Sequence, residues 1–220
     1  MTSRFTNRTG GVSTGAFASL NLGTHVGDDL ESVTQNRAIV EKSVGPIQFM
    51  TQVHGDRIAI IEGVTDVDPT ADALVTGIRG ISLAVQVADC IPLLLNSREV
   101  VAAVHVGRRG LVNEITRKTI SLMREMGAQG ISAIIGPAIC ASCYEVSQEI
   151  FDEVVGLHPF AQSKTPAGTP ALDLPAALRS VLSDEGVGIV NKFTCTVESS
   201  EHFSYRRDGI TGRQAGIISL

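Results

Sequence analysis

The segment LAVQVADCIPLLLNSREVVAAVHVGRRG, residues 83–110, decides the fold of the chain and carries most of its reactive side chains. Apolar residues recur at alternate positions over residues 81–87, and residues 100–106 are rich in valine, so both segments are predicted to be β-strands. The apolar run 91–95 lies between them, and the Asn-Ser pair that follows it favours a turn before the second strand.

The reactive side chains of this segment stand at the ends of its strands. Cys90 follows the first strand and His105 closes the second, so we expect the two side chains to meet at one edge of a sheet. Arg108 and Arg109 lie between two glycines, directly before a helical pattern over residues 111–126. Backbone amides and guanidinium groups would converge there, which predicts a spot that attracts anions.

The remaining elements alternate between helical and extended patterns. Apolar spacing predicts further helices over 33–44, 150–157 and 174–181, and strands over 48–53, 57–61, 131–135, 187–197 and 217–218. The residues between the strands 48–53 and 57–61 are predicted to form a turn that carries His54, and residues 66–76 a polar loop. Segments 7–21 and 202–213 are rich in turn-forming residues, and the first is a candidate binding loop.

The composition limits the class of protein. With 43% hydrophobic residues among 220, the chain can bury a sizeable core, and its length suits one domain over residues 1–220. The net charge is −5 and no long basic run is present, which argues against a general nucleic-acid or membrane-surface binder and favours a small-molecule substrate. Because neither a signal-peptide pattern nor a membrane-spanning apolar run is found, we expect a cytoplasmic protein.

The four cysteines do not suggest a disulfide framework in a chain of this length, so they are ligands, nucleophiles or core residues. Cys140 and Cys143 form a Cys-x-x-Cys pair, but a structural zinc site needs a second pair of ligands at similar spacing, and the sequence contains none. Structural zinc is therefore not predicted there. Cys195 alternates with Phe193 and Val197 and is assigned to the core.

Three strand-end residues, His54, Cys90 and His105, meet the need of a catalytic zinc ion for three protein ligands and one open position. The same residues support a second interpretation without metal, in which Cys90 is a nucleophile activated by His105, as in a cysteine hydrolase or deamidase. Asp89 is a weaker candidate for orienting the histidine, since neighbours along a strand point to opposite faces. A third interpretation makes all three ordinary core or turn residues, and spacing alone does not choose among them.

Seven motifs in a fixed order resemble the YfiH family, also called the laccase-domain or purine nucleoside phosphorylase family. They cover nearly the whole chain and read NRTGGVSTGAFASLNLG (7–23), QVHGD (52–56), ADALVT (71–76), VADCIPLLL (87–95), VAAVHVGRRG (101–110), GPAICASCYEV (136–146) and FSYRRDGITGR (203–213). The resemblance implies an α+β fold, a mixed β-sheet sandwich flanked by helices. It also implies a Zn²⁺ site made by His54, Cys90 and His105.

The resemblance further implies activity on purine nucleosides: phosphorolysis of adenosine, inosine, guanosine and methylthioadenosine, and deamination of adenosine to inosine. Family members have also been assigned as copper-dependent polyphenol oxidases or as peptidoglycan editing factors, and the fold is similar to that of cytotoxic necrotizing factor deamidases. Five histidines are too few for multicopper centres. The remaining alternatives are a hydrolase or deamidase acting on peptidoglycan precursors and a purine-binding protein without turnover.

The residues partly support the nucleoside interpretation on chemical grounds. Deamination at purine C6 needs an activated water, which zinc supplies, and Asp89 is the nearest carboxylate in sequence for proton transfer. Phosphorolysis needs an anion clamp, for which Arg108, Arg109 and Arg206 are candidates together with Arg207 and Arg213. Asn21 and Arg37 match family motif positions near the pocket. The expected partners are thus a nucleoside and phosphate, without nucleic acid or membrane, and the expected state is a monomer or small homo-oligomer.

Overall fold

The centre of the fold is the hairpin of β6 (Ile91–Asn96) and β7 (Val101–Val106), in a computed structural model that describes residues 2–220. The two strands are antiparallel and pair Ile91 with Val106. The Ser97 hydroxyl accepts hydrogen bonds from the backbone amides of Glu99 and Val100, which closes the turn between them. The predicted turn is therefore confirmed, and the apolar run 91–95 is a strand whose residues are all buried.

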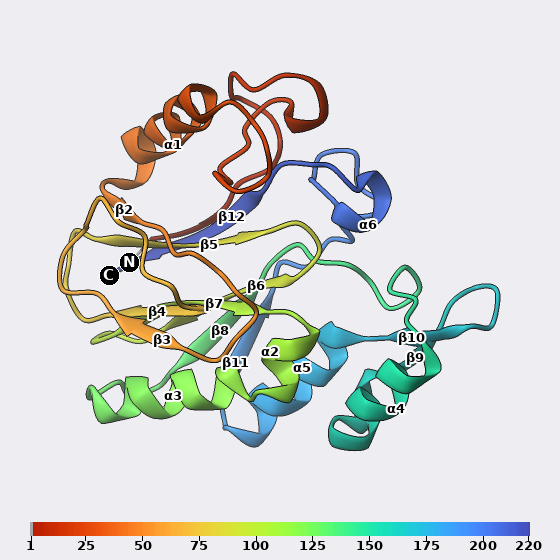
Figure 1. Cartoon of the computed structure of the whole chain (residues 1–220). Coiled ribbons are helices and arrows are strands. Elements are labelled where there is room, and N and C mark those ends of the chain that lie inside the picture. The colour runs from red at the N-terminus through yellow and green to blue at the C-terminus, as the bar shows by residue number, and fades with distance from the viewer. Residues whose placement is uncertain (1) are drawn as a thin grey trace.

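Two sheets face each other in the structure (Figure 1). The larger sheet has the order β11 (Gly188–Asn191), β8 (Ser132–Ile135), β6, β7, β4 (Ala73–Thr76) and β3 (Ile58–Ile60). The smaller sheet has the order β1 (Thr2–Phe5), β12 (Gln214–Ser219), β5 (Ser82–Val87) and β2 (Ile47–Gln48). Both contain parallel and antiparallel pairs, and a separate two-stranded ribbon pairs β9 (Gln162–Lys164) with β10 (Pro170–Leu172).

Alternation along the strands produces three apolar layers. Leu83 and Val85 of β5 pack with Leu94 and Ala103 of the larger sheet between the two sheets. The opposite face of the larger sheet packs against α2 (Arg108–Val112), α3 (Ile115–Glu125), α4 (Gln148–Leu157) and α5 (Leu174–Asp184). The smaller sheet is covered by α1 (Leu30–Val44). The predicted mixed β-sheet sandwich flanked by helices is confirmed.

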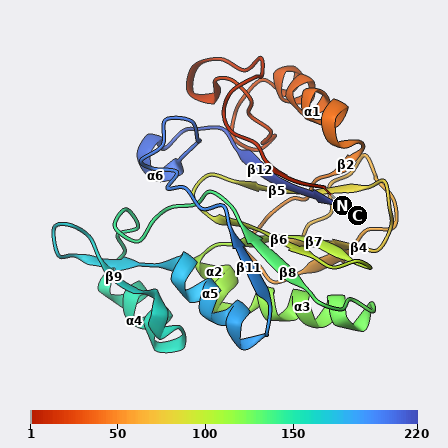
Figure 2. The ribbon, with the colours of Figure 1, turned by 180° about the vertical axis from the view of Figure 1, so that it is seen from behind.

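The view from behind shows β11 and β8 running side by side, and both termini at the same end of the smaller sheet (Figure 2). The short elements are α6 (Tyr205–Asp208) and the 3₁₀ turns η1 (Gly15–Phe17) and η2 (Pro159–Ala161). None of the helices in residues 2–220 has the length and apolar character needed to cross a membrane.

Four predicted elements differ from the structure. No hairpin spans 48–61, because β2 lies in the smaller sheet and β3 in the larger one, so the chain crosses between sheets there. The predicted loop 66–76 ends in the buried strand β4. The predicted helix 111–126 is broken after Val112, since Glu114 has a φ of 59°. The predicted strand 187–197 stops at Asn191, and Cys195 forms only an isolated bridge with Ala138.

Candidate metal centre and pocket

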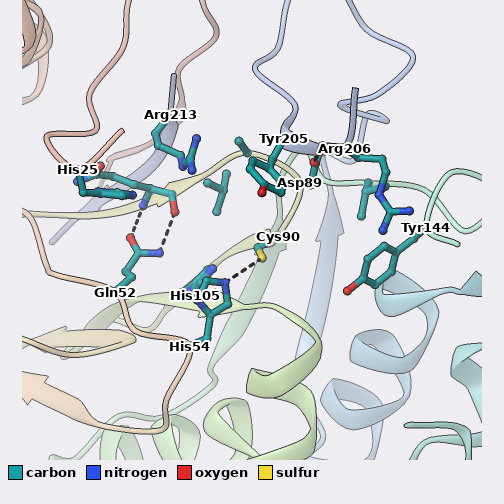
Figure 3. A pocket seen from close by; sticks show the side chains of 14 residues that line it. His25, Gln52, His54, Asp89, Cys90, His105, Tyr144, Tyr205, Arg206 and Arg213 are labelled. Carbon is teal, nitrogen blue, oxygen red and sulfur yellow. Dashed lines mark hydrogen bonds between the residues drawn. The ribbon is translucent and has the colours of Figure 1, made fainter. Parts of the chain in front are cut away.

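The structure brings together three of the residues singled out in the sequence. His54 comes from the loop between β2 and β3, Cys90 from the crossing between β5 and β6, and His105 from β7. One potential ligand atom from each lies within 4.8 Å of the others, and the Cys90 Sγ is 3.9 Å from the His54 Nε2. The two imidazole rings meet edge to face, with centroids 4.6 Å apart (Figure 3).

The β6–β7 register explains why Cys90 reaches His105. Cys90 directly precedes β6 and Gly107 directly follows β7, so the two residues lie side by side at the same end of the hairpin. A Cβ atom on Gly107 would lie 2.9 Å from the Cys90 Sγ and 3.4 Å from the His54 Cδ2. Only glycine therefore leaves the sulfur and the imidazole in their places.

Asp72, directly before β4, positions both histidines. One of its carboxylate oxygens accepts hydrogen bonds from the His54 amide at 2.9 Å and the His105 Nδ1 at 2.8 Å. The other accepts from the amides of Val53 at 3.2 Å and Gly55 at 2.7 Å. These bonds hold His54 at a φ of 59°, in the left-handed region that is rare for residues other than glycine. Sequence reasoning missed Asp72, whose partners lie 17 to 33 residues away.

Asp72 also fixes the tautomer of His105. An ionised carboxylate only accepts, so in the neutral ring Nδ1 carries the proton and Nε2 keeps its lone pair. The carboxylate is fully buried; burial opposes ionisation, but the hydrogen bonds from His105 and the Gly55 amide outweigh it and lower the pKa of Asp72. A carboxylate behind an imidazole is the arrangement that orients histidine ligands of metals.

Cys90 and His105 shift one another's protonation when no metal is bound. Burial disfavours the Cys90 thiolate, but the positive charge of His105 outweighs it and lowers the Cys90 pKa to about 6. Burial likewise disfavours protonation of His105, yet the charge of Cys90 and the hydrogen bond to Asp72 raise its pKa to about 9. A thiolate beside an imidazolium suits either a nucleophile or, once the imidazole proton is displaced, a metal site. Zinc binds thiolate sulfur and imidazole nitrogen, so one thiolate and two imidazoles are a suitable set of ligands for it.

A pocket of about 320 Å³ opens in front of the three residues, which falls in the range of small-molecule sites, about 300–1,000 Å³. Its walls include polar, aromatic and cationic side chains (Figure 3). The labelled lining residues are His25, Gln52, His54, Asp89, Cys90, His105, Tyr144, Tyr205, Arg206 and Arg213. Sequence reasoning did not select Gln52, Tyr144 or Tyr205, because each enters the pocket from a loop or a short helix.

Asp89 lines the pocket. In the part of the chain that the structure describes, it makes no hydrogen bond with His105. Its carboxylate accepts hydrogen bonds of 2.6 Å from the Thr196 hydroxyl and from the backbone amide of Arg206. Its backbone has a φ of 99°, and its carbonyl accepts from the Ile139 amide at 2.9 Å. Asp89 thus joins the strand end that carries Cys90 to two other walls of the pocket.

The arginines predicted to bind anions fall into two groups. Arg206 lines the pocket, stacks its guanidinium 5.3 Å from the Tyr144 ring and donates to the Glu145 carbonyl. Arg213 also lines it, and burial lowers the pKa of its guanidinium. Arg108 instead pairs with Glu153 at 3.0 Å, and Arg109 is exposed; neither lines this pocket.

Asn21 and Arg37 lie behind the pocket wall. The Asn21 carboxamide is fully buried, and its oxygen accepts a hydrogen bond of 2.8 Å from the backbone amide of Arg213. Arg37 donates to the Leu22 carbonyl, pairs with Asp68 at 3.3 Å and stacks on Phe49. Neither is among the lining residues, so the structure places both as supports of the loops that form the wall.

Comparison with known proteins assigns the family. Residues 2–220 match the family model described as "Multi-copper polyphenol oxidoreductase laccase". The purine nucleoside phosphorylase SCO2081 of Streptomyces coelicolor is 45% identical over 98% of this chain and 94% of its own length. The structure of protein NMB0706 of Neisseria meningitidis matches with a TM-score of 0.88 and 41% identity, covering 99% of this chain and 93% of that one.

The YfiH protein of Bacillus licheniformis matches with a TM-score of 0.87 and 31% identity, covering 99% of this chain and 92% of its own. Similarity over nearly the whole of both chains, at these identities, confirms the resemblance that the seven motifs indicated. The chain belongs to the YfiH or laccase-domain family, whose model is described as multi-copper polyphenol oxidoreductase laccase.

Proposed function

We propose that the chain is a zinc-dependent purine nucleoside enzyme that binds Zn²⁺ through His54, Cys90 and His105. The observation that carries the proposal is the cluster of these three donors on the wall of a nucleoside-sized pocket, backed by the buried carboxylate of Asp72. Relatives such as SCO2081 are named purine nucleoside phosphorylases, which supports this substrate class. The proposed reactions are phosphorolysis of adenosine, inosine, guanosine and methylthioadenosine and deamination of adenosine.

Each wall of the pocket has a part in this proposal. Arg206 and Arg213 bind the phosphate, because guanidinium groups match its geometry and charge. Tyr144 and Tyr205 contact the flat faces of the purine. Asp89, which lines the pocket, transfers the proton that the departing base or ammonia requires. Zinc, when bound, supplies a Lewis acid that lowers the pKa of water to about 7.

The test is a product assay with purified protein and four nucleosides: adenosine, inosine, guanosine and methylthioadenosine. Chromatography should detect free base only when phosphate is present, and inosine from adenosine whether or not phosphate is present. The Arg206→Ala variant should lose base release more strongly than deamination, since phosphate takes part only in the former. Absence of turnover of all four nucleosides by zinc-loaded protein would contradict the proposal.

One observation favours a second candidate, the Cys-His hydrolase or deamidase. With a pKa of about 6 for Cys90 and about 9 for His105, metal-free protein at neutral pH holds Cys90 as a thiolate and His105 as an imidazolium. This is the charge state of a cysteine nucleophile beside its general acid. The copper-oxidase alternative has less support. Among the described residues, His158 contacts the Leu111 carbonyl and His202 contacts Ser199, and neither belongs to the cluster around Cys90.

Gly107→Ala should weaken zinc binding by at least about tenfold, a loss typical when metal ligands are poorly oriented. The added methyl group would lie 2.9 Å from the Cys90 Sγ and must displace it. Zinc affinity is measured by competition with a chromophoric chelator. Gly156→Ala is the matched control, because a Cβ at that helical position meets no atom within 4 Å. Equal affinities in the two variants would show that Cys90 does not ligate the metal.

A further inference from the structure

A second group of potential metal ligands lies apart from the first and shares no residue with it. It consists of Cys140, Cys143, Cys195 and Glu198, and one ligand atom from each lies within 4.8 Å of the others. The Glu198 Oε1 is 3.8 Å from both the Cys140 and the Cys143 Sγ. Cys195 is only 7% exposed, whereas Cys140 and Cys143 are partly exposed. The sequence argued against a metal here because it contains no second pair of ligands at similar spacing, and Cys195 was assigned to the core.

Backbone hydrogen bonds hold the two contributing loops together. The Ala138 amide donates to the Thr194 carbonyl at 3.1 Å, and the Thr196 amide donates to the Ala138 carbonyl at 3.0 Å. This short parallel bridge places Cys195 next to the turn in which the Cys143 amide donates to the Cys140 carbonyl. These backbone hydrogen bonds between and within the two loops therefore hold the four side chains close together.

The spacing suits a tetrahedral metal. With metal–sulfur bonds of about 2.3 Å and metal–oxygen bonds of about 2.1 Å, a tetrahedral site places sulfur and oxygen about 3.6 Å apart. The two sulfur–oxygen distances to Glu198 are each within a few tenths of an ångström of that value. Three thiolates and one carboxylate complete four-fold coordination without an open position, which is the pattern of a structural site, and soft thiolates select zinc over magnesium or calcium.

We propose that Cys140, Cys143, Cys195 and Glu198 bind a structural Zn²⁺ that clamps two walls of the pocket. The first loop carries Ile139 and Tyr144, which line the pocket. The second loop carries Thr196, whose hydroxyl donates to Asp89. A metal between the loops fixes the position of both walls relative to Cys90.

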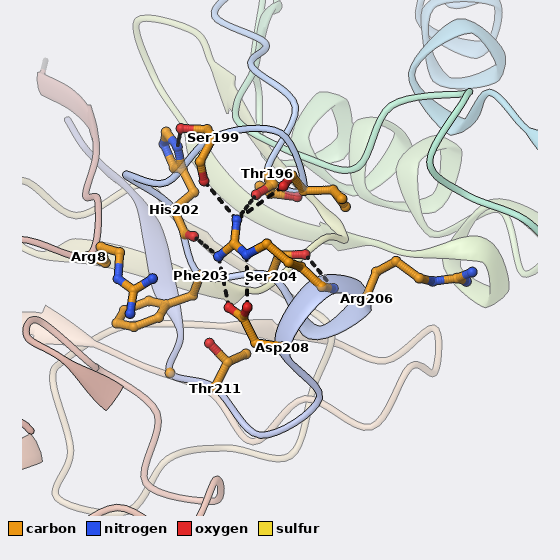
Figure 4. A network of polar contacts seen from close by, with 12 residues as sticks. Arg8, Thr196, Ser199, His202, Phe203, Ser204, Arg206, Asp208 and Thr211 are labelled. Atoms are coloured by element: carbon orange, nitrogen blue, oxygen red, sulfur yellow. Dashed lines mark hydrogen bonds and ion pairs between the residues drawn. The ribbon is translucent and has the colours of Figure 1, made fainter. Parts of the chain in front are cut away.

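The second loop is also tied to α6. The Arg207 guanidinium donates to the carbonyls of Thr196, Val197 and Ser199 at 2.9–3.2 Å, to the His202 carbonyl, and to Asp208 (Figure 4). Arg206, the preceding residue of the same helix, donates to the carbonyl of Glu145, which lies just beyond Cys143 in the chain. The clamp therefore extends from the cysteines to the cation that we assign to phosphate binding.

The test is zinc stoichiometry in protein purified under reducing conditions without added metal. Wild type should hold two zinc ions per chain, Cys143→Ser one, and Cys90→Ala one. Ser142→Ala is the matched control and should hold two, because Ser142 lies 3.2 Å from the Cys140 Sγ without being a ligand. Glu198→Gln, at an exposed position, should fold normally and lose the second zinc to a chelator more readily.

Cobalt substitution supplies a readout independent of activity. The sulfur-to-cobalt absorption grows with the number of thiolates, so wild type should show the signal of four thiolates and Cys143→Ser that of Cys90 alone. A wild-type content of one zinc that Cys143→Ser retains and Cys90→Ala loses would overturn the second site. One zinc that Cys90→Ala retains would support it and instead contradict the site in the proposed function. A Cys140–Cys143 disulfide in reduced wild-type protein would also overturn it.

Discussion

Asp72→Asn is expected to lower zinc affinity by about 10- to 100-fold and to cost about 2–4 kcal/mol of unfolding free energy in metal-free protein. The carboxylate accepts four hydrogen bonds, two on each oxygen. An amide group replaces one accepting oxygen by a donor. If the NH₂ group faces Val53 and Gly55, two backbone amides lose their partner and the loop that holds His54 at its positive φ is released.

The other orientation of the amide is no better. With the NH₂ group facing His105, the ring must accept at Nδ1, so the proton moves to Nε2 and the nitrogen lone pair needed for zinc is lost. Competition with a chelator measures the zinc affinity, and chemical denaturation measures the free energy of unfolding. Asp56→Asn is the control, because Asp56 lies in the same loop but makes only an exposed ion pair with Lys118. If Asp72→Asn matches Asp56→Asn in zinc affinity, Asp72 does not position the ligands.

Asp72 also contributes to the dependence of stability on pH. Its pKa is lower in the folded protein than in the unfolded chain, so the stabilisation is present above the unfolded value, about 3.9, and is lost as the pH falls through the lower folded value. His105 behaves oppositely in metal-free protein. Its pKa rises to about 9, so its contribution is complete below about 6.5 and is lost as the pH rises through 9.

The sequence was sufficient for contacts made by neighbouring strands. Cys90 and His105 could be brought together because 15 residues separate them and the intervening turn is marked by Ser97. The apolar patterns over residues 81–87 and 100–106 likewise located β5 and β7, although both strands are buried on both faces. His54 was grouped with Cys90 and His105 as a strand-end residue, and the family resemblance implied the same ligand, but the expected hairpin around it does not form. The chain changes sheets there, so His54 reaches the site from a loop.

The sequence was insufficient where the partners meet through loops. Asp72 accepts hydrogen bonds from three backbone amides. Every residue except proline has such an amide, so these bonds leave no residue pattern in the sequence. Cys195 was assigned to a strand of the core, yet that strand ends at Asn191 and an isolated bridge turns the residue toward Cys140 and Cys143. Arg108 and Arg109 illustrate the opposite case. They are adjacent to the site in sequence, but the turn into α2 directs one to Glu153 and leaves the other exposed.

Alkylation of Cys90 should be at least about tenfold slower in zinc-loaded protein than in protein stripped by a chelator, because a zinc-bound thiolate is shielded as well as deprotonated. In the stripped protein the rate should reach half its maximum near pH 6, since the His105 charge lowers the pKa of Cys90 to that value. An ordinary thiol would instead reach half-maximum near pH 8.5. Labelling is followed on the peptide that contains Cys90, which separates it from the other cysteines.

The same measurement decides what the sulfur of Cys90 does. A zinc ligand predicts that chelation abolishes turnover, that added zinc restores it, and that alkylation before zinc is returned blocks the recovery. A catalytic nucleophile must be accessible in the active enzyme, so it predicts rapid loss of activity on alkylation with or without chelator. Cys90→Ala serves as the control for labelling elsewhere, since it keeps Cys140, Cys143 and Cys195. Rapid stoichiometric labelling of Cys90 in metal-loaded, active protein, or full activity after complete removal of zinc, would favour the cysteine hydrolase over the zinc enzyme.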